Sequence, residues 1–271
     1  MSDSPYELVV VGGGNMGAAL LGGIVDSGTV SGSIAVVEVI HERRSELAER
    51  FPTVDVVDAL PSCAAAIIAV KPNGVPDAVR DAVVAGARRV LSIAAGLTTE
   101  RLDDAAAGAA TSRDRRVAVV RAMPNTPALV RRGAAAICAG AHASDEDLER
   151  ASGLLRAVGT VDVLREDQLD AFTGVIGSGP AYVFLLAESL TDAAIDEGIA
   201  RDVAERAVRQ LFVGASALLD RDDADPATLR EQVTSPGGTT AAGLARFDAH
   251  DLRGTVRDAV SSATERSREL G

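Results

Sequence analysis

The sequence predicts an α/β fold in which an N-terminal, doubly wound sheet is followed by an all-α domain. Over residues 1–164, short apolar runs rich in β-branched residues alternate with segments of helical period. This alternation is typical of a mainly parallel sheet covered by helices on both faces. Over residues 165–271 the strand signals disappear and long segments of helical period replace them. We therefore predict two domains, 1–164 and 165–271, that join directly.

Each predicted element rests on a local pattern. The continuously apolar run Ala65–Val70 is typical of a strand buried on both faces, and Ser144 with Asp147 has the spacing of a capping box. The predicted strands are Leu8–Val11, Ile34–Glu38, Asp55–Val57, Ala65–Val70, Arg89–Ile93, Val117–Ala122 and Ala134–Ala139. The predicted helices are Asn15–Asp26, Glu42–Arg50, Val75–Val84, one capped by Thr98 or Thr99, one from Ser144 to about Val158, Pro180–Glu197, Val203–Leu219, Pro226–Val233, Thr239–Phe247 and Leu252–Leu270.

Several helices of the second half carry apolar faces that are too rich for an exposed single helix. Residues 183–186 and 207–219 are the main examples. A helical domain of this size buries such faces against a second subunit. We therefore expect self-association through the helical half.

The charge balance restricts the partners. The net charge is −12, and Lys71 is the one lysine among 27 basic residues. A general excess of acid argues against nucleic acid or an anionic membrane as a partner. Dispersed acidic residues, almost no lysine and 3% aromatics suggest a halophilic protein that stays soluble in concentrated salt. GC-rich codon usage, which favours Ala, Gly and Arg over Lys, is the alternative explanation.

The remaining composition favours a cytoplasmic protein. No run of about 18 apolar residues without charge is evident, so we expect no transmembrane helix. Residues 1–5 carry no basic segment and the apolar stretch from Leu8 breaks at Gly12, which argues against a signal peptide. Cys63 and Cys138 lie far apart without metal-ligand spacing, so we expect both to be small buried residues.

The first predicted strand leads into Gly12-Gly13-Gly14-Asn15-Met16-Gly17, which matches the dinucleotide fingerprint G-x-G-x-x-G between a strand and a helix. Gly12 permits the tight turn, Gly14 lets backbone amides approach a pyrophosphate, and Gly17 lets the helix pack against the sheet. The helix N-terminus then offers unpaired N–H groups to phosphates. The pattern predicts a Rossmann-like doubly wound domain that binds NAD(P)H. A glycine-rich turn without a ligand is the alternative.

An acidic residue ends the second predicted strand. Glu38 lies 21 residues after Gly17, where a carboxylate can bind the ribose 2′-hydroxyl and repel a 2′-phosphate, which favours NADH. Arg43 and Arg44 follow closely and could instead reach a phosphate. Glu38 could also be a solvated loop residue, so the choice of cofactor stays open.

Three further strand ends carry unusual loops. Ala69, Val70, Lys71 and Pro72 follow the fourth strand, Ala94, Ala95 and Gly96 follow the fifth, and residues 123–127 (Met-Pro-Asn-Thr-Pro) follow the sixth. Ligands of doubly wound sheets bind beyond the carboxyl ends of the strands, and small residues let backbone approach a flat ring. Lys71 is a candidate site residue because the chain otherwise lacks lysine. The alternative is an ordinary surface lysine at the end of a strand.

Two loops of the helical half complete the set. Residues 177–182 (Gly-Ser-Gly-Pro-Ala-Tyr) start a helix with Pro180 in its first turn. Residues 233–243 contain a Ser-Pro-Gly-Gly turn that delivers Thr239 and Thr240 to a helix start. Successive backbone N–H groups in such a turn can hold a carboxylate. An ordinary turn with Thr239 or Thr240 as N-cap is the alternative.

Together these strings resemble pyrroline-5-carboxylate reductase from about residue 7 to residue 262. Gly-Gly-Gly-Asn-Met-Gly, Ala-Val-Lys-Pro, Arg-Ala-Met-Pro-Asn-Thr-Pro, Gly-Ser-Gly-Pro-Ala-Tyr and Val-Thr-Ser-Pro-Gly-Gly-Thr-Thr occur in the family's order and spacing. The resemblance implies a Rossmann domain followed by an α-helical dimerisation domain, often assembled into larger rings. It also implies an active site between the nicotinamide and the helical domain of the neighbouring subunit.

The resemblance further assigns site residues. It implies cofactor contacts at Gly12–Gly17, Ala69–Pro72 and Ala94–Gly96. It implies substrate contacts at Gly238, Thr239 and Thr240, which hold the carboxylate, and at Glu166. The chain departs from the family at Gln232 and at residues 56–58, where family members often have Asn. These departures concern the adenosine side and the choice of cofactor more than the reaction.

The implied reaction is the reduction of 1-pyrroline-5-carboxylate to L-proline, the last step of proline biosynthesis, by hydride transfer to a cyclic C=N bond. Hydride attack is easier on a protonated imine, and the Thr240 hydroxyl is the candidate donor at the ring nitrogen. A hydroxyl is too weak an acid to be the sole proton source, so the substrate binds protonated or takes a proton from water. We expect positioning of the two reactants to supply most of the acceleration.

Two other functions are compatible with a dinucleotide loop. A hydroxyacid dehydrogenase of the 6-phosphogluconate type resembles this chain at the loop but uses a catalytic lysine in the second domain, and no lysine follows Lys71. A non-catalytic dinucleotide-sensing protein would have no reason to pair the loop with the threonine turn. The histidines His41, His142 and His250 lack triad or metal spacing, so we expect no bound metal.

Overall fold

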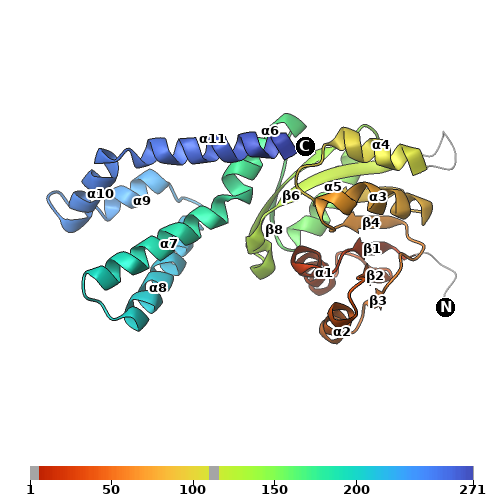
Figure 1. The fold of residues 1–271 in the computed structure, drawn as a ribbon, viewed down its shortest axis with the longest axis horizontal. Helices are drawn as coiled ribbons and strands as arrows, with labels where there is room; N and C mark the ends of the chain where they lie inside the picture. Colours follow the sequence, from red (N-terminus) through yellow and green to blue (C-terminus); the bar gives the residue numbers. More distant parts are fainter. Residues whose placement is uncertain (1–5, 110–115, 271) are drawn as a thin grey trace. The chain divides into compact units, whose positions relative to one another are not determined.

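The computed structural model describes residues 6–109 and 116–270 and divides into two compact units (Figure 1). The first unit comprises residues 1–178 together with 262–271, and the second comprises residues 179–261. The first unit contains the sheet, and the second is helical. The predicted fold class, an α/β domain followed by a helical one, is confirmed.

The first unit is built on an eight-stranded sheet with the order β3-β2-β1-β4-β5-β6-β7-β8. The strands are β1 (Leu8–Val11), β2 (Ile34–Val37), β3 (Asp55–Val57), β4 (Ala65–Ile68), β5 (Arg89–Ser92), β6 (Ala118–Pro124), β7 (Gly133–Ala139) and β8 (Gly159–Val163). Neighbouring strands pair in parallel except β6 with β7, as a mainly parallel sheet requires. The order reverses between β1 and β4, which is the topological switch point where such sheets bind ligands.

Two features of the sheet differ from the sequence prediction. The edge strand β8 escapes prediction because its short Gly-Thr-Val-Asp-Val run mixes polar and apolar residues and is largely exposed. The antiparallel pair arises because only residues 125–132, which include the short 3₁₀ turn Thr126–Val130, separate β6 from β7. A parallel pairing would need a crossover of about a dozen or more residues.

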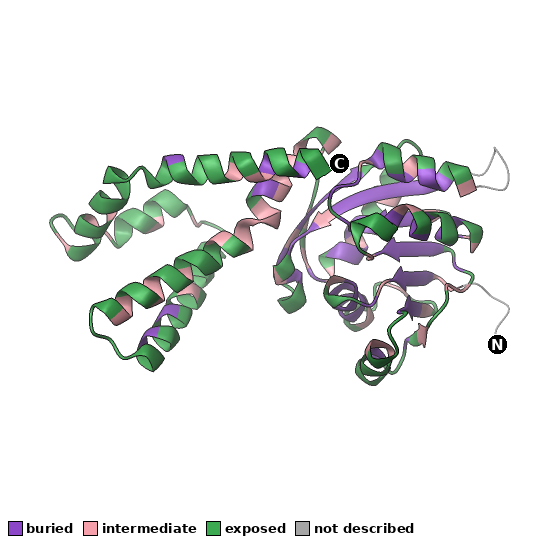
Figure 2. Ribbon diagram, in the orientation of Figure 1, coloured by how far each residue is buried: buried purple, intermediate pink, exposed green. Residues whose placement is uncertain are grey.

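Helices cover both faces of the sheet, and its central strands are buried (Figure 2). One core joins a sheet face to α1 (Asn15–Ser27), α2 (His41–Arg50) and α5 (Asp145–Arg156). The other core joins the opposite face to α3 (Val75–Val84) and α4 (Thr99–Ala109). Adjacent strand residues point to opposite faces, so the continuously apolar runs fill two cores at once.

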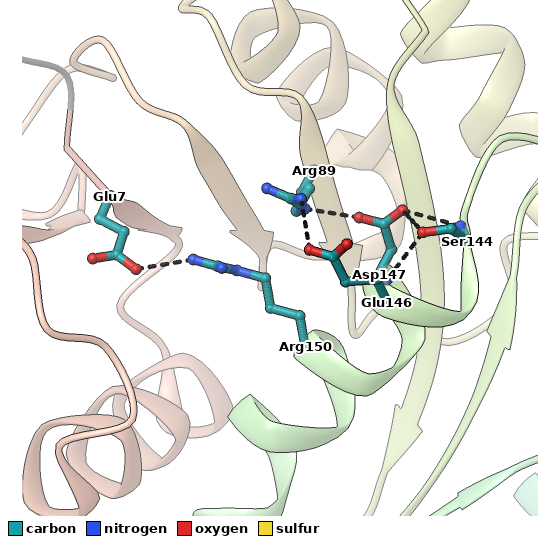
Figure 3. A network of polar contacts seen from close by, with 6 residues as sticks. All are labelled: Glu7, Arg89, Ser144, Glu146, Asp147 and Arg150. Carbon is teal, nitrogen blue, oxygen red and sulfur yellow. Dashed lines mark hydrogen bonds and ion pairs between the residues drawn. The ribbon is translucent and has the colours of Figure 1, made fainter.

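A polar network fastens α5 at the amino ends of the strands (Figure 3). Ser144 and Asp147 form the predicted capping box at the start of α5. Arg89, at the start of β5, donates from Nε to Asp147 Oδ1 at 2.7 Å, and Arg150 Nη2 donates to Glu7 Oε1 at 2.9 Å. This network stabilises packing at the edge opposite to the carboxyl ends of β1, β4 and β5.

Both cysteines are free and buried, as the sequence predicts. Burial raises the pKa of the Cys63 thiol to about 11. Burial, with the nearby Glu166 carboxylate, raises the pKa of the Cys138 thiol to about 12. Only the thiolate is a strong nucleophile, so both side chains act as small apolar residues.

The second unit is formed by α7 (Gly179–Asp196), α8 (Arg201–Leu219), α9 (Pro226–Gln232), α10 (Thr239–Ala249) and the first part of α11 (Leu252–Leu270), whose last residues belong to the first unit. Helices α7 and α8 pack against each other. Many of their large apolar side chains are nevertheless exposed (Figure 2), among them Phe184 at 66% and Leu185 at 62%.

The segment Glu166–Asp196 is long and apolar enough, by length and composition alone, to cross a membrane. It contains no charged residue between Asp170 and Glu188, which differs from the sequence expectation that no segment is long and apolar enough to span a membrane. The same segment begins the helical half, for which the sequence predicts apolar faces covered by a second subunit. Its apolar surface is therefore also what a subunit interface needs.

Candidate active site

The glycine loop lies at the switch point and contacts the loop after β4. Gly12 has φ +109, and a Cβ added there would lie 2.7 Å from the carbonyl oxygen of Ala69. A Cβ added to Gly17 would lie 2.0 Å from the carbonyl oxygen of Gly12. Side chains at either position would collide with backbone, so the close packing of β1, α1 and β4 depends on glycine here.

Gly14 differs from its two neighbours in the fingerprint. A Cβ added to Gly14 would meet nothing within 4 Å. Gly14 is the N-cap of α1, with extended backbone and no side-chain capping bond. The N-terminus of α1 therefore faces open space with uncapped N–H groups, which fits a pyrophosphate.

Glu38 and Arg43 border this loop. Glu38 is only 9% exposed, and its Oε1 accepts a hydrogen bond from the Ile40 N–H at 3.0 Å. It faces Gly13, where an added Cβ would lie 3.1 Å from Glu38 Oε2. Arg43 donates from Nε to the Gly13 carbonyl at 3.0 Å and from Nη2 to Asn15 Oδ1 at 3.2 Å. A carboxylate and a guanidinium therefore both border the glycine loop.

The next two strand ends extend the same edge. After β4, Ala69 and Val70 are half-buried, and Lys71 is exposed where a 3₁₀ turn begins at Pro72. After β5, Ala94 is buried and Ala95 is exposed. Gly96 has φ +74, and a Cβ added there would lie 3.1 Å from Leu270 Cβ of α11. The structure brings these predicted cofactor residues to one edge of the sheet.

A buried arginine on β6, the strand next to β5, belongs to this region. It has no role predicted from the sequence. Arg121 of β6 has a side chain only 5% exposed, and its Nη1 donates to Glu166 Oε1 at 2.9 Å. Glu166 begins α6 (Glu166–Phe172) and also accepts two hydrogen bonds from Thr99, the first residue of α4. The Thr99 N–H donates to Oε1 at 2.6 Å and the Thr99 hydroxyl to Oε2. An arginine inside the apolar run of a predicted strand was the signal that could have identified this contact.

Asp170 and Ser267 complete this cluster, which we call the Arg121 network (Arg121, Glu166, Thr99, Asp170 and Ser267). Arg121 Nη2 lies 3.9 Å from Asp170 Oδ1. The Ser267 hydroxyl of α11 donates to the same Asp170 oxygen at 2.7 Å. The network therefore connects β6, α4, α6 and the end of α11 within the first unit.

The network changes the titration of Glu166. Burial acts to raise the pKa of Glu166, but the hydrogen bonds from Thr99 and Arg121 and the arginine charge outweigh it and hold the pKa below its ordinary value. A carboxyl group with a lowered folded-state pKa stabilises the fold above its ordinary unfolded pKa. This stabilisation is lost as the pH falls through the lowered value.

Asn125 positions the segment that leads into α7. Its Nδ2 donates to the Ile176 carbonyl at 3.2 Å, and its Oδ1 accepts from the Ala134 N–H at 2.9 Å. Ile176 lies in a π-helical turn over Thr173–Gly177, a form that is frequent at functional sites. Pro180 occupies the first turn of α7, as expected. The predicted Met-Pro-Asn-Thr-Pro loop therefore acts here as a structural support.

The threonine turn belongs to the second unit. Gly237 has φ +72 and Gly238 is the N-cap of α10, without a side-chain capping bond. The alternative that Thr239 or Thr240 caps this helix is therefore wrong, because both lie inside it and are exposed. Within the described residues, neither hydroxyl has a hydrogen-bond partner. The turn thus presents uncapped N–H groups and two available hydroxyls.

Two family models match the chain. The model described as pyrroline-5-carboxylate reductase dimerisation matches residues 166–270. The model described as NADP oxidoreductase, coenzyme F420-dependent, matches residues 7–96. The first spans the helical half, and the second spans the glycine loop and the loops after β4 and β5.

Curated relatives match over nearly the whole chain. The pyrroline-5-carboxylate reductase of Pseudomonas aeruginosa is 37% identical, covering 98% of this chain and 97% of that protein. The Mycobacterium tuberculosis enzyme of the same name is 34% identical, covering 97% and 96%. That of Pisum sativum is 33% identical, covering 100% and 97%.

Solved structures agree with these relatives. The pyrroline-5-carboxylate reductase of Coxiella burnetii superposes with a TM-score of 0.86 at 28% identity, covering 99% of each chain. The Plasmodium falciparum pyrroline carboxylate reductase with NADP bound gives 0.80 at 26% identity, covering 98% of each chain. With full-length relatives above 30% identity and a matching dimerisation segment, this chain belongs to the pyrroline-5-carboxylate reductase family.

Proposed function

We propose that this chain catalyses the NAD(P)H-dependent reduction of 1-pyrroline-5-carboxylate to L-proline, the last step of proline biosynthesis. The full-length relatives carry the name of that enzyme, and one similar structure contains NADP. The observation that carries the proposal is the glycine loop, which is closed by packing at Gly12 and Gly17 and open at Gly14 over the uncapped N-terminus of α1. That shape fits the pyrophosphate of a dinucleotide.

The remaining assignments place the two reactants. The loops Ala69–Pro72 and Ala94–Gly96 bind the cofactor beyond the glycine loop. The backbone N–H groups of Thr239 and Thr240 hold the substrate carboxylate, which the uncapped start of α10 favours. Gly238 lines the same turn, and its own N–H donates to the Ser235 carbonyl at 3.0 Å. Glu166 borders the site, with both carboxylate oxygens engaged by Thr99 and Arg121.

Bound NAD(P)H supplies a hydride for the ring carbon of the C=N bond, whose electron pair moves to the nitrogen as the nitrogen gains a proton. The Thr240 hydroxyl donates a hydrogen bond to that nitrogen and orients the ring. The proton arrives with the substrate or from water, because a hydroxyl is too weak an acid to supply it alone. The chain's main contribution is to hold the two reactants in line.

The direct test follows the absorbance at 340 nm in molar KCl with 1-pyrroline-5-carboxylate and with each cofactor in turn. Oxidation of NADH or NADPH with formation of proline supports the proposal. Cofactor binding without oxidation would favour a dinucleotide sensor. Oxidation of neither cofactor would defeat the reductase assignment.

Glu38 is proposed to favour NADH over NADPH. The Glu38→Gln variant keeps an oxygen acceptor for the Ile40 N–H and removes the charge that repels a 2′-phosphate. We expect the ratio of kcat/KM for NADPH to that for NADH to rise about tenfold. Steady-state kinetics with both cofactors measures this ratio, and Glu42→Gln on the exposed side of α2 is the control. An unchanged ratio in Glu38→Gln would remove Glu38 from cofactor selection.

The dimerisation segment supports self-association. We propose that the exposed apolar side chains of α7 and α8 are covered by a second copy, and that dimers assemble further into rings. Exposed residues such as Phe184 and Leu211 would otherwise leave a large apolar surface in water.

A high-salt cytoplasm is the proposed environment. With a net charge of −12 and one lysine, repulsion between acidic groups destabilises the fold in dilute buffer. We expect the urea concentration at the midpoint of unfolding to rise from low salt to molar KCl. The rise should continue above a few tenths molar KCl, where simple screening of the charges is nearly complete. A midpoint indifferent to KCl would leave GC-rich codon usage as the explanation.

A further inference from the structure

We infer that Arg121, Glu166 and Thr99 are positioning residues that set the place of the loop 93–98, which contains the proposed cofactor contacts Ala94–Gly96; this inference rests on the proposed function. The loop leaves the sheet after Ser92 of β5 and enters α4 at Thr99. Ser92 is fixed by the strands on both sides of it. The position of the other end depends on what holds Thr99.

Glu166 holds Thr99 with both of its oxygens. The Thr99 backbone N–H donates to Oε1 at 2.6 Å, and its hydroxyl donates to Oε2. Two bonds to one residue fix its orientation as well as its place, because rotation about either bond would break the other. Glu166 is distant in sequence, so this contact is not a local helix cap but a link from α6.

Arg121 in turn fixes Glu166. It sits inside β6, where the backbone is held by β5 and β7, and its guanidinium is almost fully buried. A buried guanidinium has few alternative partners, so it keeps Glu166 Oε1 at 2.9 Å. The chain of contacts therefore runs from a rigid strand through Glu166 to the end of the cofactor loop.

A second set of contacts reaches the middle of the same loop. Leu270, the last residue of α11, lies against Gly96, where an added Cβ would lie 3.1 Å from Leu270 Cβ and 3.2 Å from the Leu270 carbonyl oxygen. The Ser267 hydroxyl of the same helix binds Asp170 of α6 at 2.7 Å. Asp170 also faces Arg121. The end of the loop is thus held from α6 and its middle from α11, and the Ser267–Asp170 bond joins these two helices.

The test uses Thr99→Val, which removes the hydroxyl but keeps the N–H and the branched shape, with Thr99→Ser as the conservative rescue. Glu166→Gln is the second variant, because it preserves size and removes the charge that faces Arg121.

The readouts are the Kd of NADH and NADPH by fluorescence titration, kcat, KM, and the kinetic isotope effect with cofactor deuterated at the transferred hydride. We expect Thr99→Val and Glu166→Gln to raise the cofactor Kd about tenfold and to increase the isotope effect. Thr99→Ser should restore values within about twofold of the wild type.

Asp147→Asn is the matched control, since it breaks an arginine–carboxylate bond of similar length to Arg89 at the opposite edge of the sheet. It should lower Tm without changing the Kd, KM or isotope effect. If Thr99→Val and Glu166→Gln lower Tm but leave the Kd, KM and isotope effect unchanged, the network is structural and the inference is overturned. An inactive wild type would instead refute the reductase activity, and the cofactor Kd values would still test the inference.

Discussion

Replacing Gly14 by serine is expected to keep or raise the thermal stability of the protein while weakening cofactor binding at least tenfold. Gly14 has extended backbone that any residue adopts, and its side-chain position is empty for 4 Å. Serine is a favoured N-cap, and its hydroxyl would accept a hydrogen bond from the first turn of α1. That bond and the added atoms would occupy the N–H groups and the space that a pyrophosphate needs.

Differential scanning calorimetry and fluorescence titration with NADH and NADPH measure the two effects separately. Gly108→Ser in α4 is the control, because that position is also open but lies outside the proposed site. Gly17→Ala provides the contrast, since its Cβ would lie 2.0 Å from the Gly12 carbonyl oxygen and should cost stability as well as binding. Normal cofactor affinity in Gly14→Ser would show that the loop does not hold the pyrophosphate.

The Thr240→Ala variant is expected to lower kcat at least tenfold with a near-normal cofactor Kd. Gly238, not Thr240, is the N-cap of α10, so removing the hydroxyl should change the stability by no more than about 0.5 kcal/mol. The hydroxyl has no partner within the described part of the chain. Its loss should therefore act on the substrate, where it removes the hydrogen bond that orients the ring nitrogen.

Single-turnover kinetics with saturating cofactor isolates this step. Thr240→Ser should retain most of the activity because it keeps the donor. Thr239→Ala should act less strongly, since the proposal gives Thr239 only a backbone role. Unchanged turnover in Thr240→Ala would remove Thr240 from the mechanism.

The elements that could be predicted from the sequence are those with strong local patterns. The β1 run before Gly12, the capping box at Ser144 and the long apolar run of β4 each carry their own signal. The strand β8 carries none, because an edge strand needs neither an apolar run nor strict alternation. Its place depends on pairing with β7, which is a long-range property.

The candidate site likewise contains residues that could be predicted from local patterns and contacts that could not. The fingerprint glycines could be predicted because each backbone conformation demands a specific residue. Arg121 could be noticed as a charged residue inside a predicted strand, but its partner could not be identified, because Glu166 is far along the chain and only the folded sheet brings the two together. The sequence allows Thr239 or Thr240 as N-cap of α10, whereas the structure has Gly238 there, directly after Gly237 with its positive φ.

The single lysine has a practical consequence. Lys71 is exposed directly after β4, at the edge that carries the glycine loop. Reagents that acylate or cross-link amines therefore have one side chain to modify, apart from the terminal amine. A fluorophore or a surface tether attached through this side chain lies at the proposed dinucleotide edge rather than at a random face of the molecule.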